Sequence, residues 1–243
     1  MSSQHENNGI IRMKRPRLDP DRAELLARWL LILLSVASGI QYYLQGNMIR
    51  VVSALLTIGL FILFPLAGRL LKLAFPPSFK VIWLLFIIAA MYLGELHNFF
   101  YRFSWWDEMV HSCTAMLLTY SALIVAHILS RDRDMPLHMG PLMTAALMLS
   151  MTLAFGAVWE LFEFSVDKVL GLNLLKGRAT TDMNSVYDWQ RALENTMADL
   201  LMDLSGALAV AAAALLHFRK GGKSLFGKPL KEFIRLNGRL FDQ

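Results

Sequence analysis

The sequence is poor in charged residues and almost free of cysteine. Only 18% of its 243 residues are charged, whereas soluble domains usually have about 25%. The single cysteine, Cys113, excludes an internal disulfide and says little about the cellular compartment. Hydrophobic residues make up 56% of the chain, and the mean hydropathy is +0.44. These features exclude an ordinary soluble domain and favour a membrane protein.

The chain has no internal repeat, but it has six long apolar runs. Each is close to the ~20 residues that a helix needs to cross the hydrocarbon core of a bilayer. We therefore predict an all-α, polytopic membrane protein with one domain, a bundle of six transmembrane helices within residues 23–218. A signal peptide is the alternative for the first run, but no convincing cleavage site follows it. The expected spans are residues 24–44, 48–71, 79–97, 106–129, 141–164 and 195–217.

Both ends of the chain are basic. Residues 1–22 are polar and predict a disordered cytoplasmic tail. In residues 219–243, Leu and Phe alternate with Lys and Arg, which predicts a short amphipathic helix on the membrane surface. The net charge of +5 would suggest nucleic acid in a soluble protein. Here the basic residues lie mostly between apolar runs, so the expected partner is the lipid bilayer and not nucleic acid.

The distribution of Lys and Arg predicts the orientation. With six spans, 18 of the 24 basic residues lie on the side that holds both termini. Cytoplasmic loops are enriched in Lys and Arg, so both termini are expected in the cytoplasm. The six basic residues on the other side are Arg50, Arg102, Lys168, Lys176, Arg178 and Arg191.

Ionisable residues lie near the outer ends of four spans in this topology. Asp107 opens the fourth span beside Trp105 and Trp106, and His111 follows one helical turn later on the same face. Charged groups within membrane segments are costly and are often functional. The main candidates for one shared site are Asp107, His111, Glu160, Glu163, Asp199 and Asp203, and the secondary candidates are Glu95, His97 and Asp182.

So many carboxylates cannot all be ionised in a low-dielectric site without compensation. A divalent metal ion would compensate the negative charge, with the six main candidates as possible ligands. Protons shared between carboxylates would also reduce the negative charge. Either arrangement allows acid–base or Lewis-acid chemistry. His111 is the leading acid–base candidate because the ordinary pKa of histidine is near neutral.

Several of these residues also have plainer interpretations. Asp107 could be a helix N-cap, and Asp199 could complement the dipole of a first helical turn. Glu163 could be solvated at the membrane interface, and His97 could be a loop residue without a role. His111, Glu160 and Asp203 are harder to explain in these ways, because they lie beyond caps or within apolar sequence.

Three motifs occur in order along the chain: Trp106-Asp107 with His111, Trp159-Glu160 with Glu163 and Phe164, and Asn195-Thr196-Met197 with Asp199 and Asp203. On these residues the chain resembles the YjdF-like family of bacterial inner-membrane proteins. It is similar, more distantly, to VanZ-like proteins, which are linked to glycopeptide resistance and envelope lipids. The resemblance covers residues 80–215. It implies a six-helix bundle in the bacterial inner (cytoplasmic) membrane. VanZ-like proteins tend to have glutamine where this chain has Glu163.

Three functions remain open on this pattern. The first is an enzyme that modifies or hydrolyses lipid or lipid-linked headgroups at the outer leaflet. The second is a proton- or cation-coupled transporter, although transporter sites usually lie near the bilayer midplane with broken helices. The third is a non-catalytic scaffold in which the polar cluster only holds the bundle together. The pattern predicts no particular oligomeric state.

Overall fold

The computed structural model describes residues 20–130, 139–180, 182, 184–221 and 224–240. Within them, six helices are long and apolar enough to cross a membrane, which confirms the predicted all-α bundle. A short helix at the carboxy-terminal end is confirmed as well. The elements are α1 (Pro20–Leu44), α2 (Met48–Leu70), α3 (Pro77–Ile87) with a π-helical continuation (Ile88–Leu96), α4 (Phe99–Arg102), α5 (Trp106–Leu129), α6 (Pro141–Leu170), α7 (Trp189–Arg219) and α8 (Lys228–Leu236).

Two predicted spans were too short. Helix α6 continues past Phe164 to Leu170 and ends at Gly171, whose φ of 65° lies in the left-handed region that favours glycine. Helix α7 begins six residues before Asn195, because the Asp188 carboxylate accepts hydrogen bonds from the backbone amides of Gln190 (2.9 Å) and Arg191 (3.3 Å). The loop between α6 and α7 therefore has 18 residues, 171–188.

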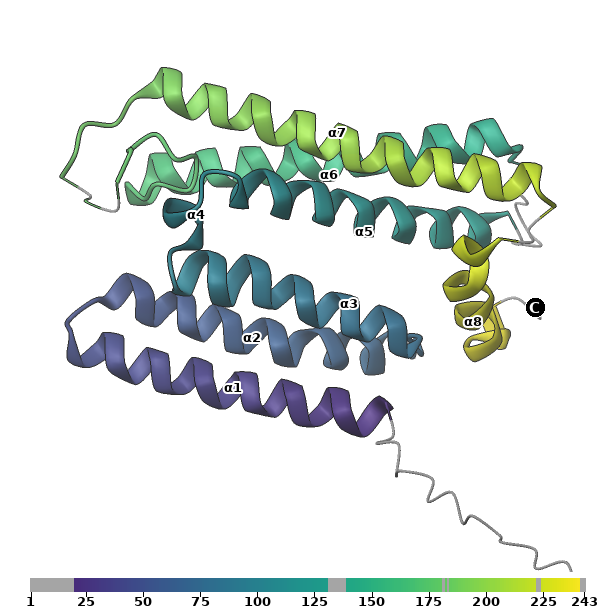
Figure 1. Cartoon of the computed structure of the whole chain (residues 1–243), viewed down its shortest axis with the longest axis horizontal. Helices are drawn as coiled ribbons and strands as arrows, with labels where there is room; N and C mark the ends of the chain where they lie inside the picture. The colour runs from purple at the N-terminus through teal and green to yellow at the C-terminus, as the bar shows by residue number, and fades with distance from the viewer. Residues whose placement is uncertain (1–19, 131–138, 181, 183, 222–223, 241–243) are drawn as a thin grey trace, which may run out of the picture.

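The long helices form two groups of three, α1–α3 and α5–α7 (Figure 1). Helix α4 joins them at the end of the bundle that also carries residues 171–188, which we call the loop end. Helix α8 lies at the opposite end, where α1 begins and α7 ends, which we call the terminal end. Most of the predicted tail 1–22 lies outside the described residues, but residues 20–22 belong to α1.

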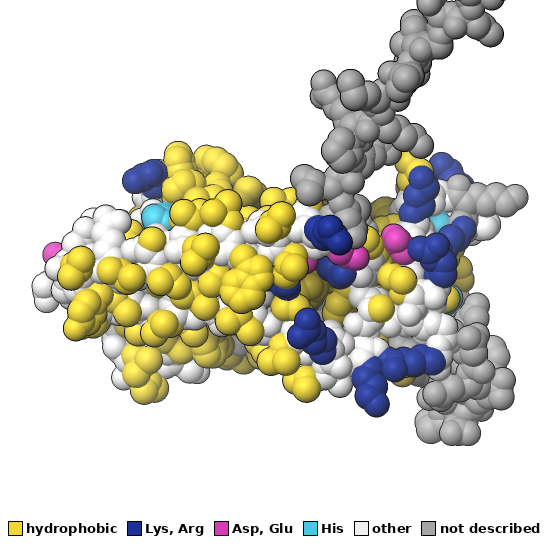
Figure 2. All heavy atoms as spheres, turned by 90° about the horizontal axis from the view of Figure 1, so that it is seen from below, with side chains coloured by type: hydrophobic (Ala, Val, Ile, Leu, Met, Phe, Trp, Pro, Cys, Tyr) yellow, Lys and Arg dark blue, Asp and Glu magenta, His cyan; other side chains and the backbone are white. Residues whose placement is uncertain are grey.

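The surface of the bundle is apolar along its length. Figure 2 shows apolar side chains over the middle of the face that includes α1, with Lys and Arg gathered toward the end where α1 begins. Leu30, Leu33 and Leu63 are each more than half exposed. An apolar groove of about 480 Å³ also separates α3 from α5. Such a surface suits contact with lipid.

Small residues let α5, α6 and α7 approach closely. Ala115, Ala207 and Ala214 are fully buried, and a Cβ on Gly206 of α7 would overlap the backbone carbonyl of Ser112 in α5. Interfaces of this kind hold membrane helices together by close packing. They also fix the relative positions of the polar side chains on α5 and α7.

Candidate functional site

His111 of α5 lies between two carboxylates of α7. Its Nδ1 is 3.4 Å from Asp203 Oδ1, and its Nε2 is 3.8 Å from Asp199 Oδ2. The two aspartates are four residues apart and therefore share one face of α7. All three side chains are at most 12% exposed. The structure thus brings together an imidazole and two acids, a set that can bind or transfer a proton.

Gly156 of α6 makes room for Asp203. A Cβ at position 156 would overlap the Oδ2 atom of Asp203. The α6 backbone is therefore in close contact with the carboxylate that faces His111. Any larger residue at position 156 would push Asp203 out of this position.

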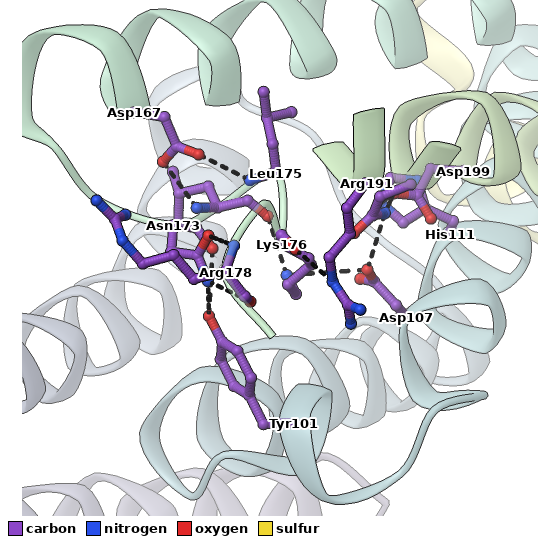
Figure 3. Close-up of polar contacts among 12 residues, drawn as sticks. Tyr101, Asp107, His111, Asp167, Asn173, Leu175, Lys176, Arg178, Arg191 and Asp199 are labelled. Carbon is purple, nitrogen blue, oxygen red and sulfur yellow. Dashed lines mark hydrogen bonds and ion pairs between the residues drawn. The ribbon is translucent and has the colours of Figure 1, made fainter. Parts of the chain in front are cut away.

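Asp107 joins the cluster through Asn195 and Lys176. The Nδ2 group of Asn195 donates to Asp107 Oδ2 at 3.3 Å and also to Asp199 Oδ2. Lys176 Nζ lies 3.8 Å from Asp107 Oδ2. Figure 3 shows Asp107 together with His111, Asp199 and Lys176 at the loop end. The site is thus assembled from α5, α7 and the loop between α6 and α7.

Lys176 is surrounded by acidic groups. Burial alone would lower the pKa of Lys176, but the carboxylates of Asp107, Glu95 and Glu163 outweigh this effect and raise the pKa above the ordinary lysine value. The side chain is therefore a cation, and its ammonium group also lies over the ring of Phe100, 4.5 Å from the centroid. Lys176 compensates part of the negative charge that α5, α6 and the π-helical segment bring to the loop end.

The loop itself is held by a buried carboxylate. Asp167, near the end of α6, accepts hydrogen bonds from the backbone amides of Leu174 (2.7 Å) and Leu175 (3.0 Å) and from the Tyr187 hydroxyl (3.0 Å). Lys176 follows directly with a φ of 56°, which is unusual for a residue with a side chain. The turn that aims Lys176 at Asp107 is therefore imposed by these contacts (Figure 3).

A second set of contacts connects the loop to neighbouring helices. Asn173 accepts a hydrogen bond from the Arg178 amide (2.7 Å) and donates one to the Tyr101 hydroxyl of α4 (2.8 Å). Arg191 of α7 donates from Nε to the Lys176 carbonyl at 3.0 Å. These hydrogen bonds fix the loop to α4 and α7, so the loop is a structural part of the site.

Glu160 and Glu163 lie on α6 and are only 6% and 8% exposed. The Thr196 side chain interacts with Glu160, but the contact does not have hydrogen-bond geometry, and neither carboxylate oxygen of Glu160 has a hydrogen-bond partner among the described residues. Glu160 and Thr196 line a cavity of about 460 Å³ between α6 and α7 at the loop end. Its rim includes Leu161 and Leu193, which are 64% and 58% exposed. The cavity therefore links the lipid-facing surface to a buried acid.

The secondary candidates lie in different places. Glu95 interacts electrostatically with Lys176 and Asp107 and belongs to the same charged region. His97 packs edge-to-face on Tyr92, with 4.7 Å between ring centroids. Asp182 is exposed and accepts a hydrogen bond from the Asn184 amide at 2.9 Å, so it shapes a turn of the loop. None of the contacts among described residues connects His97 or Asp182 to His111.

Three plainer interpretations of the sequence are wrong. The N-cap of α5 is Trp105, so Asp107 does not cap the helix with its side chain. Asp199 lies in the third turn of α7, because the helix begins at Trp189, and it is too far along to complement the dipole of a first turn. Glu163 is buried and is not solvated at an interface.

Sequence reasoning missed three residues of the site. Lys176 was expected only as a basic loop residue, and no local pattern places a loop lysine against a helix start in another part of the chain. Asn195 is one turn before Asp199, and this spacing could have indicated its role. The contact of Gly156 with Asp203 depends on the packing of α6 against α7 and has no local signal.

One set of side chains has the geometry of a metal site. Asp107, His111 and Asp199 each offer one ligand atom, and these atoms all lie within 4.8 Å of one another. Asp203 is placed to accept a hydrogen bond from the other nitrogen of His111. A carboxylate in this position orients many metal-binding histidines.

The fold and the buried polar cluster define a multi-pass helical membrane protein with a charged site at one end. The chain belongs to the family described as predicted membrane protein (DUF2238), whose model matches residues 23–220. This agrees with the resemblance to YjdF-like proteins. The likeness to VanZ-like proteins is not tested by these matches and stays a prediction.

A relative from Thermotoga maritima gives a weaker match. This protein, described as uncharacterized, is 28% identical over 138 residues. The match covers 56% of this chain and 60% of the relative. No solved structure matches the chain. The comparisons establish the membrane-protein family and carry no activity with them.

Proposed function

We propose that this protein is a membrane-embedded enzyme that modifies or hydrolyses a lipid or lipid-linked headgroup at the outer leaflet. The observation that carries the proposal is the cavity between α6 and α7, which runs from exposed leucines to the unpartnered carboxylate of Glu160. A cleft lined mainly by apolar groups with a few convergent polar ones is typical of a ligand site. Its apolar rim suits acyl chains, and its polar residues suit a headgroup.

The proposed location follows from the charge distribution. Both termini would lie in the cytoplasm of a bacterial cell, because 18 of the 24 Lys and Arg are in the sequence segments expected on the same side as the termini. The loop end, with His111 and the cavity, would then face the outer leaflet of the inner membrane. This places the reactive groups near the depth of the headgroups.

His111 is the proposed acid–base residue. It would take a proton from a water or hydroxyl whose oxygen forms a bond to the phosphorus or carbonyl carbon of the headgroup ester. The bond from that atom to the leaving oxygen would break, and the proton would pass from His111 to the leaving oxygen. Asp203, 3.4 Å from Nδ1, would hold the ring and stabilise its protonated form.

The test compares the lipids of a deletion strain complemented with wild type, His111→Ala, Glu160→Gln or Glu194→Gln. Glu194 is an exposed carboxylate on the same helix as Asp199, so its variant is a matched control. Mass spectrometry of extracted lipids should show one headgroup class that changes with His111→Ala and Glu160→Gln but not with Glu194→Gln. Identical lipids in the wild-type and folded His111→Ala strains would overturn the proposal.

The two other functions have less support. A transporter needs polar groups along its path. At the terminal end, a buried apolar cluster that includes Leu123, Met148 and Phe233 lies between α5, α6, α7 and α8. A scaffold role would make His111 structural. In that case His111→Ala should lower the thermal midpoint of the purified protein, with no separate loss of lipid modification.

A further inference from the structure

The buried acids at the loop end outnumber the cations that face them. Glu95, Asp107 and Glu163 all interact with Lys176, which supplies one positive charge, and Arg50 adds a second beside Glu95. Asp199 and Asp203 face His111 in addition. Ionised carboxylates away from water need a partner charge, and a carboxylate without one takes up a proton. A bound dication would compensate the acids that Lys176, Arg50 and His111 leave unpaired.

Within this cluster, Asp199 has a carboxylate oxygen that accepts no hydrogen bond from the described residues. Asp199 is 2% exposed, and its Oδ2 atom is occupied by Asn195. Its Oδ1 atom is buried and accepts no hydrogen bond. A buried acceptor left in this state is unfavourable, and more so if it is charged. This atom is available as a ligand without the loss of an existing contact.

From these observations we infer that Asp107, His111 and Asp199 bind one divalent transition-metal ion, with Asp203 as the residue that positions His111. The ligand atoms lie within 4.8 Å of one another. Ligands about 2.2 Å from one tetrahedral ion lie roughly 3.6 Å apart. Side-chain rotations that move the ligand atoms by about 1 Å would therefore bring all three onto the ion.

The donor types indicate which metals fit. One imidazole with two carboxylates suits Zn²⁺ or Mn²⁺, whereas Ca²⁺ and Mg²⁺ prefer oxygen ligands alone. Three protein ligands leave a coordination position for water or substrate, as in catalytic zinc sites. His111 would bind the metal through Nε2, because Nδ1 faces Asp203. Asp203 would then help to set the basicity of this ligand.

The inference rests on the proposed function and changes one role in it. With the ion bound, His111 would be a metal ligand instead of the acid–base residue, and the ion would be the Lewis acid of the headgroup reaction. Its test needs no substrate. The purified full chain in detergent, freed of metal by a chelator, is titrated with Zn²⁺, and bound metal is measured after equilibrium dialysis. Wild type should bind one Zn²⁺ per chain. Asp199→Asn and His111→Gln should each weaken binding at least tenfold, and Asp203→Asn should weaken it about 10–100-fold.

Glu194→Gln is the matched control and should bind as wild type does. Circular dichroism before titration identifies any variant that fails to fold, and Asp199→Asn, which keeps the shape of the side chain, is the main probe. The inference is overturned if folded wild type binds no stoichiometric Zn²⁺, or if folded Asp199→Asn binds it as tightly. Stoichiometric binding without any lipid change in cells would refute the enzyme proposal and leave the metal site standing.

Discussion

Lys176 and Asp107 show how single residues balance charge at the loop end. The two groups are 3.8 Å apart, and their side chains are 13% and 15% exposed. Removing one partner of a buried pair leaves the other uncompensated, which is strongly destabilising. An intact pair of this kind adds little to stability, but removing Lys176 alone should destabilise the protein.

We expect Lys176→Met to lower the free energy of unfolding by about 3 kcal/mol. The reason is that Asp107 loses its cation while Glu95 and Glu163 stay nearby. The measurement is the thermal midpoint of the purified protein in detergent. Lys176→Arg keeps the positive charge, so its thermal midpoint should fall much less than that of Lys176→Met. Equal midpoints for wild type and Lys176→Met would show that Lys176 does not compensate Asp107.

Gly156→Ala should disturb the cluster by sterics alone. Its Cβ would overlap Asp203 Oδ2, and overpacking of this kind typically costs about 1–3 kcal/mol. The displaced Asp203 should also weaken Zn²⁺ binding. Gly59→Ala on α2 is the control, because nothing lies within 4 Å of its new Cβ. Gly59→Ala should leave stability unchanged or raise it slightly. A similar loss of stability in Gly59→Ala and Gly156→Ala would contradict the steric explanation.

We expect His97 to make the folded protein less stable in mild acid. Burial and the guanidinium groups of Arg50 and Arg102 lower the pKa of His97 below its ordinary value of 6.5. As the pH falls through 6.5, the unfolded chain takes up the proton first, so the free energy of unfolding decreases until the pH is below the folded pKa. His97→Gln lacks this component. The thermal midpoint of wild type should therefore fall more than that of His97→Gln between pH 7.5 and pH 5.5. The same fall in both proteins would exclude His97 as the cause.

At the scale of elements, α8 connects the two groups of helices at the terminal end. Leu230 and Phe233 are buried, and Phe233 contacts Phe75 with 6.3 Å between ring centroids. Tyr120 of α5 donates to the Phe226 carbonyl and accepts from the Leu230 amide, both at 3.0 Å. The apolar face of this predicted amphipathic helix packs against the end of the bundle, and its position at the membrane surface stays a prediction.

Asn237→Ala should release α8 from the turn between α2 and α3. The Asn237 side chain accepts from the Ala74 amide and donates to the carbonyls of Ala74 and Phe233, each at 2.8 Å. Without it the amide and carbonyl of Ala74 lose these hydrogen bonds, whereas the Phe233 carbonyl still accepts from the Asn237 backbone amide. The expected cost is on the order of 1 kcal/mol. Limited proteolysis should then cut faster within residues 219–240. Arg235→Ala is the control, because the Arg235–Glu232 pair is largely exposed and contributes little. Unchanged cleavage of Asn237→Ala would show that this contact does not hold α8.

At the scale of the whole molecule, the proposed orientation can be tested with single introduced cysteines, because Cys113 is the one native cysteine and can be replaced. In a Cys113→Ala background, Thr180→Cys lies in the exposed loop and Lys220→Cys at the exposed end of α7. A membrane-impermeant thiol reagent should label Thr180→Cys in intact cells and Lys220→Cys only after permeabilisation. The opposite pattern would place the terminal end outside and remove the basis for an outer-leaflet substrate.

Length and composition were sufficient to predict the six spans and the short carboxy-terminal helix, because hydrophobic run length and helical periodicity are local properties. The order of the spans and the charge bias also predicted that the five main acids and His111 lie at similar depths. Tertiary packing decided which of these meet. Asn195 and Asp107 are 88 residues apart in sequence, and Lys176 reaches Asp107 only because Asp167 and Asn173 shape the loop. Such contacts depend on how α5, α6 and α7 pack together, and local sequence does not encode that packing.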